Sequence, residues 1–403
     1  MEELTKPLTL KCGLTIPNRL VKAALAEQMA DHRNLPHDQF HRAYSKWADG
    51  GWGMIQTGNV FVDPAYPGMP REVSIPPEPN DEARETLAAW ARTCSAGGAT
   101  AFVQLNHGGR QSQAGAGTRS VFAKTIAPSP VPLDLGPGIL PDIARRLLFG
   151  TPREMTCADI ERVISQFAHS AAVVAEAGFD GVVLHGAHGY LLAQFLSRKT
   201  NLRQDEWGGD AERRVRIVVE VIKRVRETTP EGFALGIKLN SADHQDDQDM
   251  EETLTQVKAI VEAGVDFIEI SGGSWEDPKM MVGTPAPSAR TQAREAFFLT
   301  FANAVRSRFP DVPLMVTGGF RTRGGMAAAI RAGDCDLIGL GRPTVLDPRL
   351  PRNIIFNPDK GDSDRLYTVR WDNTWSSWMG RLMGSRSVGA GLETESQDNL
   401  TGQ

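Results

Sequence analysis

Short apolar segments alternate along most of the chain with longer segments of helical period. The apolar segments are rich in Val, Ile and Phe and generally end in Gly, Asn, His or Ser, a pattern typical of buried strands. They fall at residues 19–25, 53–60, 100–107, 181–186, 233–240, 266–273, 313–320 and 336–343. The pattern therefore predicts eight strands.

Amphipathic segments separate these strands and predict helices at residues 39–49, 81–96, 157–177, 211–228, 250–263, 294–309 and 324–332. Three of the helices end in Ala-Gly directly before the next strand, at Ala177-Gly178, Ala263-Gly264 and Ala332-Gly333. Glycine there can take the left-handed conformation that ends a helix. This order indicates repeated βα units.

Repeated βα units indicate an α/β fold with a parallel sheet covered by helices. Eight units over about 320 residues favour a closed (β/α)8 TIM barrel. An open doubly wound sheet is disfavoured because no G-x-G-x-x-G follows the first strand. We predict that the barrel spans residues 1–350 and that residues 351–403 form a C-terminal extension, disordered after about residue 385.

Two segments depart from this regular order. Residues 108–155 are rich in Gly and Pro and too long for an ordinary βα loop. We predict that they form a lid over the barrel mouth, and the alternative is an insertion without a role. The C-terminal extension carries Trp371, Trp375 and Trp378, which could pack on the last helices or on a second subunit in a homodimer.

Composition narrows the classes of partner. The 403 residues carry a formal net charge of −5 with both signs interspersed, so we expect no nucleic-acid partner. The four cysteines include no C-x-x-C pair, which disfavours a disulfide framework, a zinc site and an iron–sulfur site. No stretch of about 18 apolar residues occurs. We expect a cytoplasmic protein that acts on a small molecule and does not associate with membranes.

The last two predicted strands end in glycine-rich loops, "VTGGFRT" and "GLGRPT". The active sites of TIM barrels lie at the C-terminal ends of the strands, and these two loops commonly bind a phosphate through backbone N–H groups. Gly318, Gly319, Gly341 and Arg342 are the candidate residues. Glycines are common in turns, so one such loop alone would be weak evidence for a phosphate site. The presence of the motif in both loops is what supports the prediction.

The fourth predicted strand ends in "VVLHGAHGYLLAQF", with His185, His188 and Tyr190. Alternate residues of a strand share a face, so His185 points into the barrel if Val183 does. A metal pair is one interpretation, but H-x-x-H lacks the i,i+4 spacing and the glutamate of a metalloprotease helix. Two hydrogen-bonded structural histidines are another.

Nine motifs occur in order between about residues 4 and 352: "NRLVKAA", "GMIQTGNV", "FVQLNHGGRQ", "HGAHGYLLAQFLSRKTNLRQDEWGG", "GIKLNSAD", "EISGGSWE", "REAFF", "VTGGFRTRGGM" and "GLGRP". This set resembles the old yellow enzyme family of NAD(P)H-dependent flavin oxidoreductases, or ene-reductases. It is most similar to the fungal and bacterial NADH:flavin oxidoreductase branch. The clustered cysteines of the iron–sulfur branch, the dienoyl-CoA reductases, are absent.

The resemblance implies FMN in the barrel mouth. Its phosphate would lie on Gly318, Gly319, Gly341 and Arg342, and its ring against Ala24, Leu25, Ala26, Gly58 and His185. Gln104 would bond the pyrimidine edge, since an amide both donates and accepts. Lys238 would stand beside N1 and O2, where a cation stabilises the anionic reduced flavin; the alternative is a surface or ion-paired lysine.

The resemblance also implies a reaction. His185 and His188 would bond the carbonyl or nitro oxygen of an α,β-unsaturated substrate and stabilise the charge that develops there. Tyr190 would donate a proton to the α carbon, since a phenol with the usual pKa of about 10 is protonated at neutral pH. NADPH or NADH would reduce the flavin first in the same pocket, which gives ping-pong kinetics.

Two other functions remain open from the residues. A flavin-free phosphate-binding barrel, such as an aldolase or isomerase, would share the glycine loops but would not require Gln104 and Lys238. A catalytically weak flavin- or ligand-binding accessory protein is kept open by Ala26. Many relatives have Thr or Cys there, whose side chain hydrogen-bonds the flavin O4.

Ala26→Thr should raise the reduction potential of bound FMN. The added hydroxyl restores a hydrogen bond to O4 that is stronger in the reduced flavin, worth about 1–3 kcal/mol if it is charge-assisted. A dye-equilibration titration measures the potential, and an unchanged value would contradict the role given to position 26.

Overall fold

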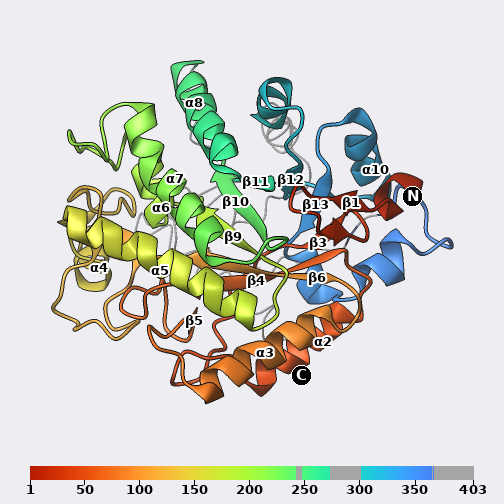
Figure 1. The fold of residues 1–403 in the computed structure, drawn as a ribbon, viewed down its shortest axis with the longest axis horizontal. Helices are drawn as coiled ribbons and strands as arrows, with labels where there is room; N and C mark the ends of the chain where they lie inside the picture. The colour runs from red at the N-terminus through yellow and green to blue at the C-terminus, as the bar shows by residue number, and fades with distance from the viewer. Residues whose placement is uncertain (242–246, 273–300, 365, 367–403) are drawn as a thin grey trace.

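Eight parallel strands close into a barrel in the computed structural model, which describes residues 1–241, 247–272, 301–364 and 366 (Figure 1). They are β3 (Leu20–Lys22), β4 (Met54–Phe61), β6 (Thr100–Asn106), β9 (Gly181–Gly186), β10 (Ala234–Asn240), β11 (Phe267–Ser271), β12 (Leu314–Thr317) and β13 (Leu337–Leu340). The barrel closes because β3 pairs with both β13 and β4. The predicted (β/α)8 fold is confirmed.

Helices surround the barrel as predicted (Figure 1). They are α2 (Asp38–Ala48), α3 (Asp81–Ser95), α5 (Cys157–Glu176), α7 (Ala211–Thr228), α8 (Asp247–Ala263) and α10 (Arg323–Ala332). Of the helix predicted at 294–309, residues 301–308 are helical and the start lies outside the described residues. Gly178, Gly264 and Gly333 have φ of +92°, +104° and +78°, which confirms the predicted helix ends.

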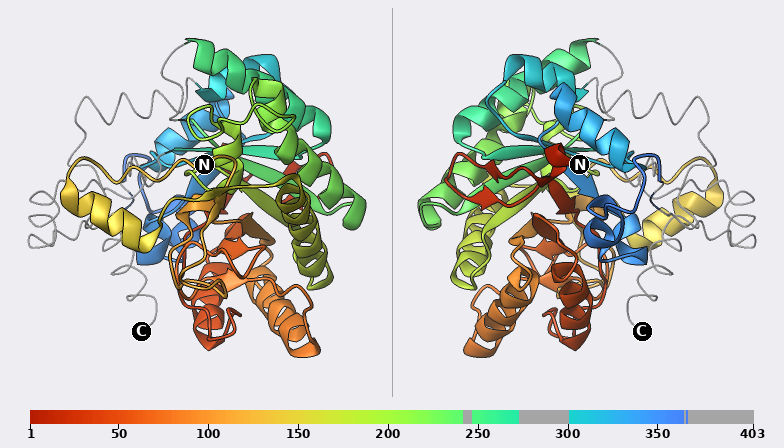
Figure 2. Two further views of the ribbon diagram at one scale, coloured as in Figure 1. Left: turned by 90° about the vertical axis from the view of Figure 1, so that its left-hand side faces the viewer. Right: turned by 90° about the vertical axis from the view of Figure 1, so that its right-hand side faces the viewer.

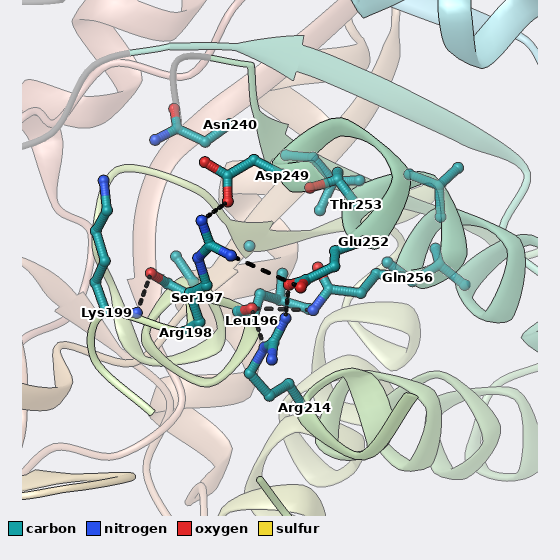
Figure 3. A pocket seen from close by; sticks show the side chains of 15 residues that line it. Leu196, Ser197, Arg198, Lys199, Arg214, Asn240, Asp249, Glu252, Thr253 and Gln256 are labelled. Atoms are coloured by element: carbon teal, nitrogen blue, oxygen red, sulfur yellow. Dashed lines mark hydrogen bonds and ion pairs between the residues drawn. The ribbon is translucent and has the colours of Figure 1, made fainter. Parts of the chain in front are cut away.

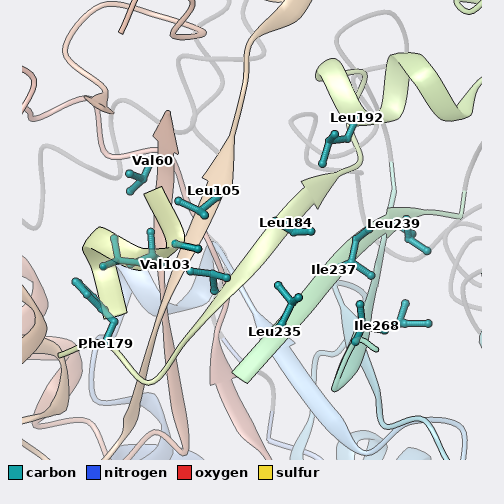
Figure 4. Packing of buried hydrophobic residues seen from close by; sticks show 14 of the residues in the cluster. Val60, Val103, Leu105, Phe179, Leu184, Leu192, Leu235, Ile237, Leu239 and Ile268 are labelled. Carbon is teal, nitrogen blue, oxygen red and sulfur yellow. The ribbon is translucent and has the colours of Figure 1, made fainter. Parts of the chain in front are cut away.

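The strands bury both faces. Their outward residues, such as Leu184, Leu235 and Ile237, pack beneath the surrounding helices (Figure 4). Their inward residues near the start of each strand form a separate apolar cluster that includes Phe102, Val183, Phe267, Met315 and Leu337. Val183 therefore points into the barrel, which meets the condition under which His185 was expected to point inward as well.

A two-stranded hairpin of β1 (Leu8–Thr9) and β2 (Thr15–Ile16) covers the end of the barrel at which the strands begin. Its Leu10 and Ile16 belong to the same cluster as the inward strand residues. It follows α1 (Glu2–Thr5). The sequence pattern did not predict it, because two-residue strands are too short to show a period.

The long excursion at 108–155 has its own short elements: η1 (Gly109–Gln111), β7 (Ile126–Ala127), α4 (Ile139–Leu148) and β8 (Arg153–Glu154). β7 and β8 pair with each other, and Figure 2 shows α4 projecting away from the barrel. η1 instead lies at the mouth, where Gln111 Nε2 donates to the carbonyl of His188 at 2.9 Å. The part of the excursion next to the histidines is thus its first turn.

Four further elements complete the described chain: β5 (Val73–Ser74), α6 (Leu191–Leu196), α11 (Pro343–Leu346) and η2 (Pro351–Ile355). β5 pairs with the end of β4, and α6 begins directly after Tyr190. The three tryptophans and the disorder predicted for the C-terminal extension lie outside the described residues. Among the helices that are described, none is long and apolar enough to cross a membrane.

Candidate active site

A layer of polar side chains, most of them buried, lies inside the barrel above its apolar cluster. The layer contains one residue each from β4, β6, β9, β10, β11 and β12, namely the buried Gln56, Gln104, His185, Lys238 and Glu269 and the half-buried Thr317. Lys238 is level with His185 on one side and with Glu269 on the other. Strand alternation places these residues on the inward face, two positions beyond apolar ones such as Phe102 and Val183.

A buried ion pair occupies the centre of this layer. Lys238 Nζ lies 2.9 Å from Glu269 Oε1. Glu269 also accepts from Thr317 Oγ1 at 2.7 Å and from Gln56 Nε2 at 3.1 Å. Lys238 is therefore ion-paired, as one sequence interpretation allowed, and its charge is balanced by a carboxylate.

Gln104 connects this pair to a second amide. Its Oε1 accepts from Lys238 Nζ at 3.4 Å, and its Nε2 donates to Asn59 Oδ1 at 2.8 Å. The sequence motifs singled out Gln104 and Lys238 but not Asn59 or Glu269. The available signal was a polar residue inside an otherwise apolar strand, which is costly unless it is hydrogen-bonded.

The two histidines contact each other at the end of β9. His185 Nε2 and His188 Nδ1 are 2.9 Å apart, and His188 Nε2 lies 3.1 Å from Ser271 Oγ. Burial holds the pKa of both imidazoles well below the usual 6.5, and the nearby Lys238 cation lowers both further. Both rings are therefore neutral at neutral pH.

His185 keeps one ring nitrogen that has no hydrogen-bond partner among the described residues. Its Nδ1 is buried and makes no hydrogen bond to any described residue, although buried polar atoms are normally bonded. The interpretation of two satisfied structural histidines is thus met for His188 alone. Within the described chain, no group of three or more His, Cys, Asp or Glu side chains could hold a metal ion.

Tyr190 completes the cluster. Its ring centroid is 4.7 Å from that of His185, and the side chain is 8% exposed. The Tyr190 hydroxyl accepts from Asn59 Nδ2 at 3.5 Å. The three residues predicted at the end of the fourth strand are therefore brought together.

The candidate ring-binding residues lie where β3 and β4 end. The amide N–H of Ala24 donates to Gln56 Oε1 at 3.2 Å. A side chain at Gly58 would collide with the carbonyl of Leu25 and with Glu27. Ala26 is half-buried beside them. Glycine is required at 58 so that β4 and the segment after β3 can approach each other.

Glu27 holds β4 against the segment after β3 through its hydrogen bonds. It accepts from the amide of Gly58 at 2.8 Å and from the Tyr44 hydroxyl, and burial raises the pKa of its carboxyl. Its carboxyl is therefore occupied by protein donors beside Ala26.

The two glycine-rich loops are neighbours, since Thr317 pairs with Gly339 across β12 and β13. Gly318 and Gly319 have φ of +107° and +86°, a conformation that favours glycine. Gly341 and Arg342 directly precede the short α11. Paired amide loops, a glutamine, a lysine and an unpartnered imidazole nitrogen form a donor set that suits FMN.

A small cavity of about 80 Å³ lies behind this site, between the ends of β9 and β10 and helices α6, α7 and α8 (Figure 3). Arg198 pairs with Asp249 at 2.6 Å, and Arg214 pairs with Glu252 at 2.5 Å. Its arginines are thus balanced by its own carboxylates, and none of the predicted site residues lines it.

Comparison with known proteins agrees with this geometry. The NADH-dependent flavin oxidoreductase iliE of Neonectria sp. (strain DH2) is 47% identical over 95% of this chain, which spans about half (51%) of that relative's length. The NADH-dependent flavin oxidoreductase iccE of Talaromyces variabilis is 46% identical, with 92% of this chain and 91% of that protein aligned.

The fold has solved counterparts. The old yellow enzyme homologue from Zymomonas mobilis superposes with a TM-score of 0.70 at 24% identity, covering 87% of this chain and 91% of that one. Residues 3–357 match the profile of the NADH:flavin oxidoreductase / NADH oxidase family. The chain therefore belongs to this family of FMN-dependent oxidoreductases, the old yellow enzyme family.

Proposed function

We propose that this protein is an NAD(P)H-dependent flavin oxidoreductase that reduces the activated C=C bond of α,β-unsaturated carbonyl or nitro compounds. The cluster of His185, His188 and Tyr190 at the end of β9 carries this proposal. It stands beside Gln104 and Lys238 in one polar layer. Family membership removes the flavin-free aldolase or isomerase as an alternative.

Bound FMN would supply hydride-transfer chemistry between NADH or NADPH and the β carbon of the alkene. Gln104 and Lys238 would bond its pyrimidine edge in this proposal. The phosphate-binding residues are Gly318, Gly319, Gly341 and Arg342, and the residues along the ring are Ala24, Leu25, Ala26, Gly58 and His185. The adjacency of the two glycine loops supports the phosphate position.

The histidine pair binds the substrate oxygen. The contact between His185 Nε2 and His188 Nδ1 uses a single hydrogen. If His185 donates it, the remaining N–H is on His188 Nε2, which faces Ser271 Oγ; if His188 donates it, the remaining N–H is on His185 Nδ1, which bonds no described residue. We infer that His188 donates, so that the N–H on His185 Nδ1 is left to hydrogen-bond the substrate oxygen and stabilise its developing negative charge.

Tyr190 is the proton donor. Its O–H bond breaks as a C–H bond forms at the α carbon, and the electron pair stays on the phenol oxygen. Asn59 Nδ2 already donates to that oxygen at 3.5 Å, so it stabilises the negative charge left there. The acid therefore comes from the segment between β9 and α6, and the charge-stabilising amide comes from β4.

The proposed reaction is tested by NADH and NADPH oxidation with and without 2-cyclohexen-1-one. Purified protein should contain FMN and oxidise the nicotinamide faster with the enone present, forming cyclohexanone. Bound FMN without enone reduction would favour the accessory-protein alternative instead.

Tyr190→Phe should slow alkene reduction by about 100- to 10,000-fold, since it removes the general acid while keeping the ring. Stopped-flow measurement of each half-reaction separates the effects, because reduction of the enzyme by NADH uses no proton from Tyr190. Equal slowing of both half-reactions would contradict the assignment.

The neutral histidines predict that acid destabilises the fold. Below pH 6.5 the histidines of the unfolded chain bind protons, whereas His185 and His188 in the native protein stay unprotonated. The free energy of unfolding should therefore decrease as the pH is lowered below 6.5, by up to about 1.4 kcal/mol per pH unit for each of the two histidines.

Urea unfolding between pH 5 and 7.5 measures this slope. His188→Asn removes one of the two titrating groups and should reduce this slope by up to about 1.4 kcal/mol per pH unit. His32→Asn alters an exposed histidine and should leave the slope as it is. An identical slope in all three proteins would show that His188 is not the group responsible.

A further inference from the structure

Glu72 is a buried acid that the proposed reaction does not use. It directly precedes β5, whose Val73 pairs with Val60 of β4, so Glu72 lies next to Asn59 along that edge. The side chain is 4% exposed. Its Oε2 accepts from the amide of Met69 at 2.7 Å, and it forms no ion pair with any described residue.

The Glu72 carboxyl and the Tyr190 ring both lie beside Gly68. A Cβ atom placed on Gly68 would be 3.0 Å from Glu72 Oε2, 3.3 Å from Phe61 Cζ and 3.5 Å from Tyr190 Cε1. The ring of Phe61 packs edge-on against that of Tyr190. The acid and the proton donor therefore both lie next to the space that glycine leaves open.

Asn59 lies next to Glu72 and contacts Tyr190. The pairing of Val60 with Val73 makes Asn59 and Glu72 neighbours across β4 and the start of β5, and Asn59 Nδ2 donates to the Tyr190 hydroxyl. Asn59 Oδ1 accepts from Gln104 Nε2, which fixes the orientation of the amide. The amide that contacts the phenol is therefore the neighbour of Glu72, so the charge of the carboxyl acts on both groups.

The surroundings favour the protonated acid. Burial raises the pKa of Glu72 to about 8, and the Glu27 carboxyl beyond the end of β3 adds to the rise. β4 contributes the uncharged Asn59, the segment before α6 contributes Tyr190, and Arg71 on the same strand segment is exposed. Glu72 is therefore mostly neutral at pH 7.

We propose that Glu72 is a positioning residue for Tyr190: its neutral carboxyl, held beside Asn59, keeps proton delivery from Tyr190 to the alkene favourable. This inference rests on the proposed function. When Tyr190 gives up its proton, negative charge develops on its oxygen. An ionised Glu72 would oppose that charge and would draw the Asn59 amide toward itself.

The two half-reactions should consequently differ in their pH dependence. Alkene reduction needs the Tyr190 proton and should decline as Glu72 ionises. Reduction of the enzyme by NADH needs no such proton and should show no matching decline. A purely structural role for Glu72 would give no such difference.

The test is single-turnover alkene reduction by the reduced holoenzyme between pH 6 and 9, using 2-cyclohexen-1-one. The wild-type rate constant should fall by roughly tenfold, following the Glu72 pKa of about 8. Glu72→Gln, which cannot ionise, should show no such fall. Glu78→Gln, an exposed acid six residues along the same segment, should behave as the wild type.

Infrared spectroscopy gives a measurement independent of activity: a protonated-carboxyl band present at pH 7 should be missing in Glu72→Gln. If Glu72→Gln does not fold, Asn59→Ser, which removes the amide next to Glu72 and Tyr190, should also bring the ratio of the rates at pH 9 and pH 7 closer to one. Coincident pH profiles for wild type and Glu72→Gln, or no missing band, overturn the inference. A wild type that reduces no enone overturns the proposed function, a distinguishable result.

Discussion

The buried ion pair between Lys238 and Glu269 determines the arrangement of the barrel mouth. Two charges out of water are stable only when they pair and satisfy their remaining hydrogen bonds, and removing one partner costs about 3–5 kcal/mol. Gln56, Gln104 and Thr317 provide those bonds from three further strands. The pair therefore links five of the eight barrel strands at one height, and Gln104 in turn orients Asn59.

The site is almost neutral overall, although many of its groups can ionise. Lys238 is balanced by Glu269, burial keeps His185 and His188 uncharged, and Glu72 retains its proton at neutral pH. Burial in a low-dielectric interior disfavours each isolated charge. When negative charge develops on a substrate in such a site, few other charges are present to screen it. The hydrogen-bond donors that point at that charge therefore stabilise it strongly.

The fold and part of the site could be predicted from the sequence, because strand alternation is a local property. It placed His185 on the same inward face as Val183, and the eight strand ends located the glycine loops. The roles of Glu269 and Asn59 were harder to predict, because they depend on which strands pair and in what register. The position of Glu72 could not be predicted from the sequence, since only the return of the chain through β5 brings it beside β4.

His188 adopts a backbone φ of +58°, in the left-handed region that few residues other than glycine occupy. His, Asn and Asp are the residues most tolerant of it. The side chain at this position also contacts the neighbouring ring of His185, which glycine could not do. Most substitutions of His188 would therefore strain the backbone, remove this contact, or do both.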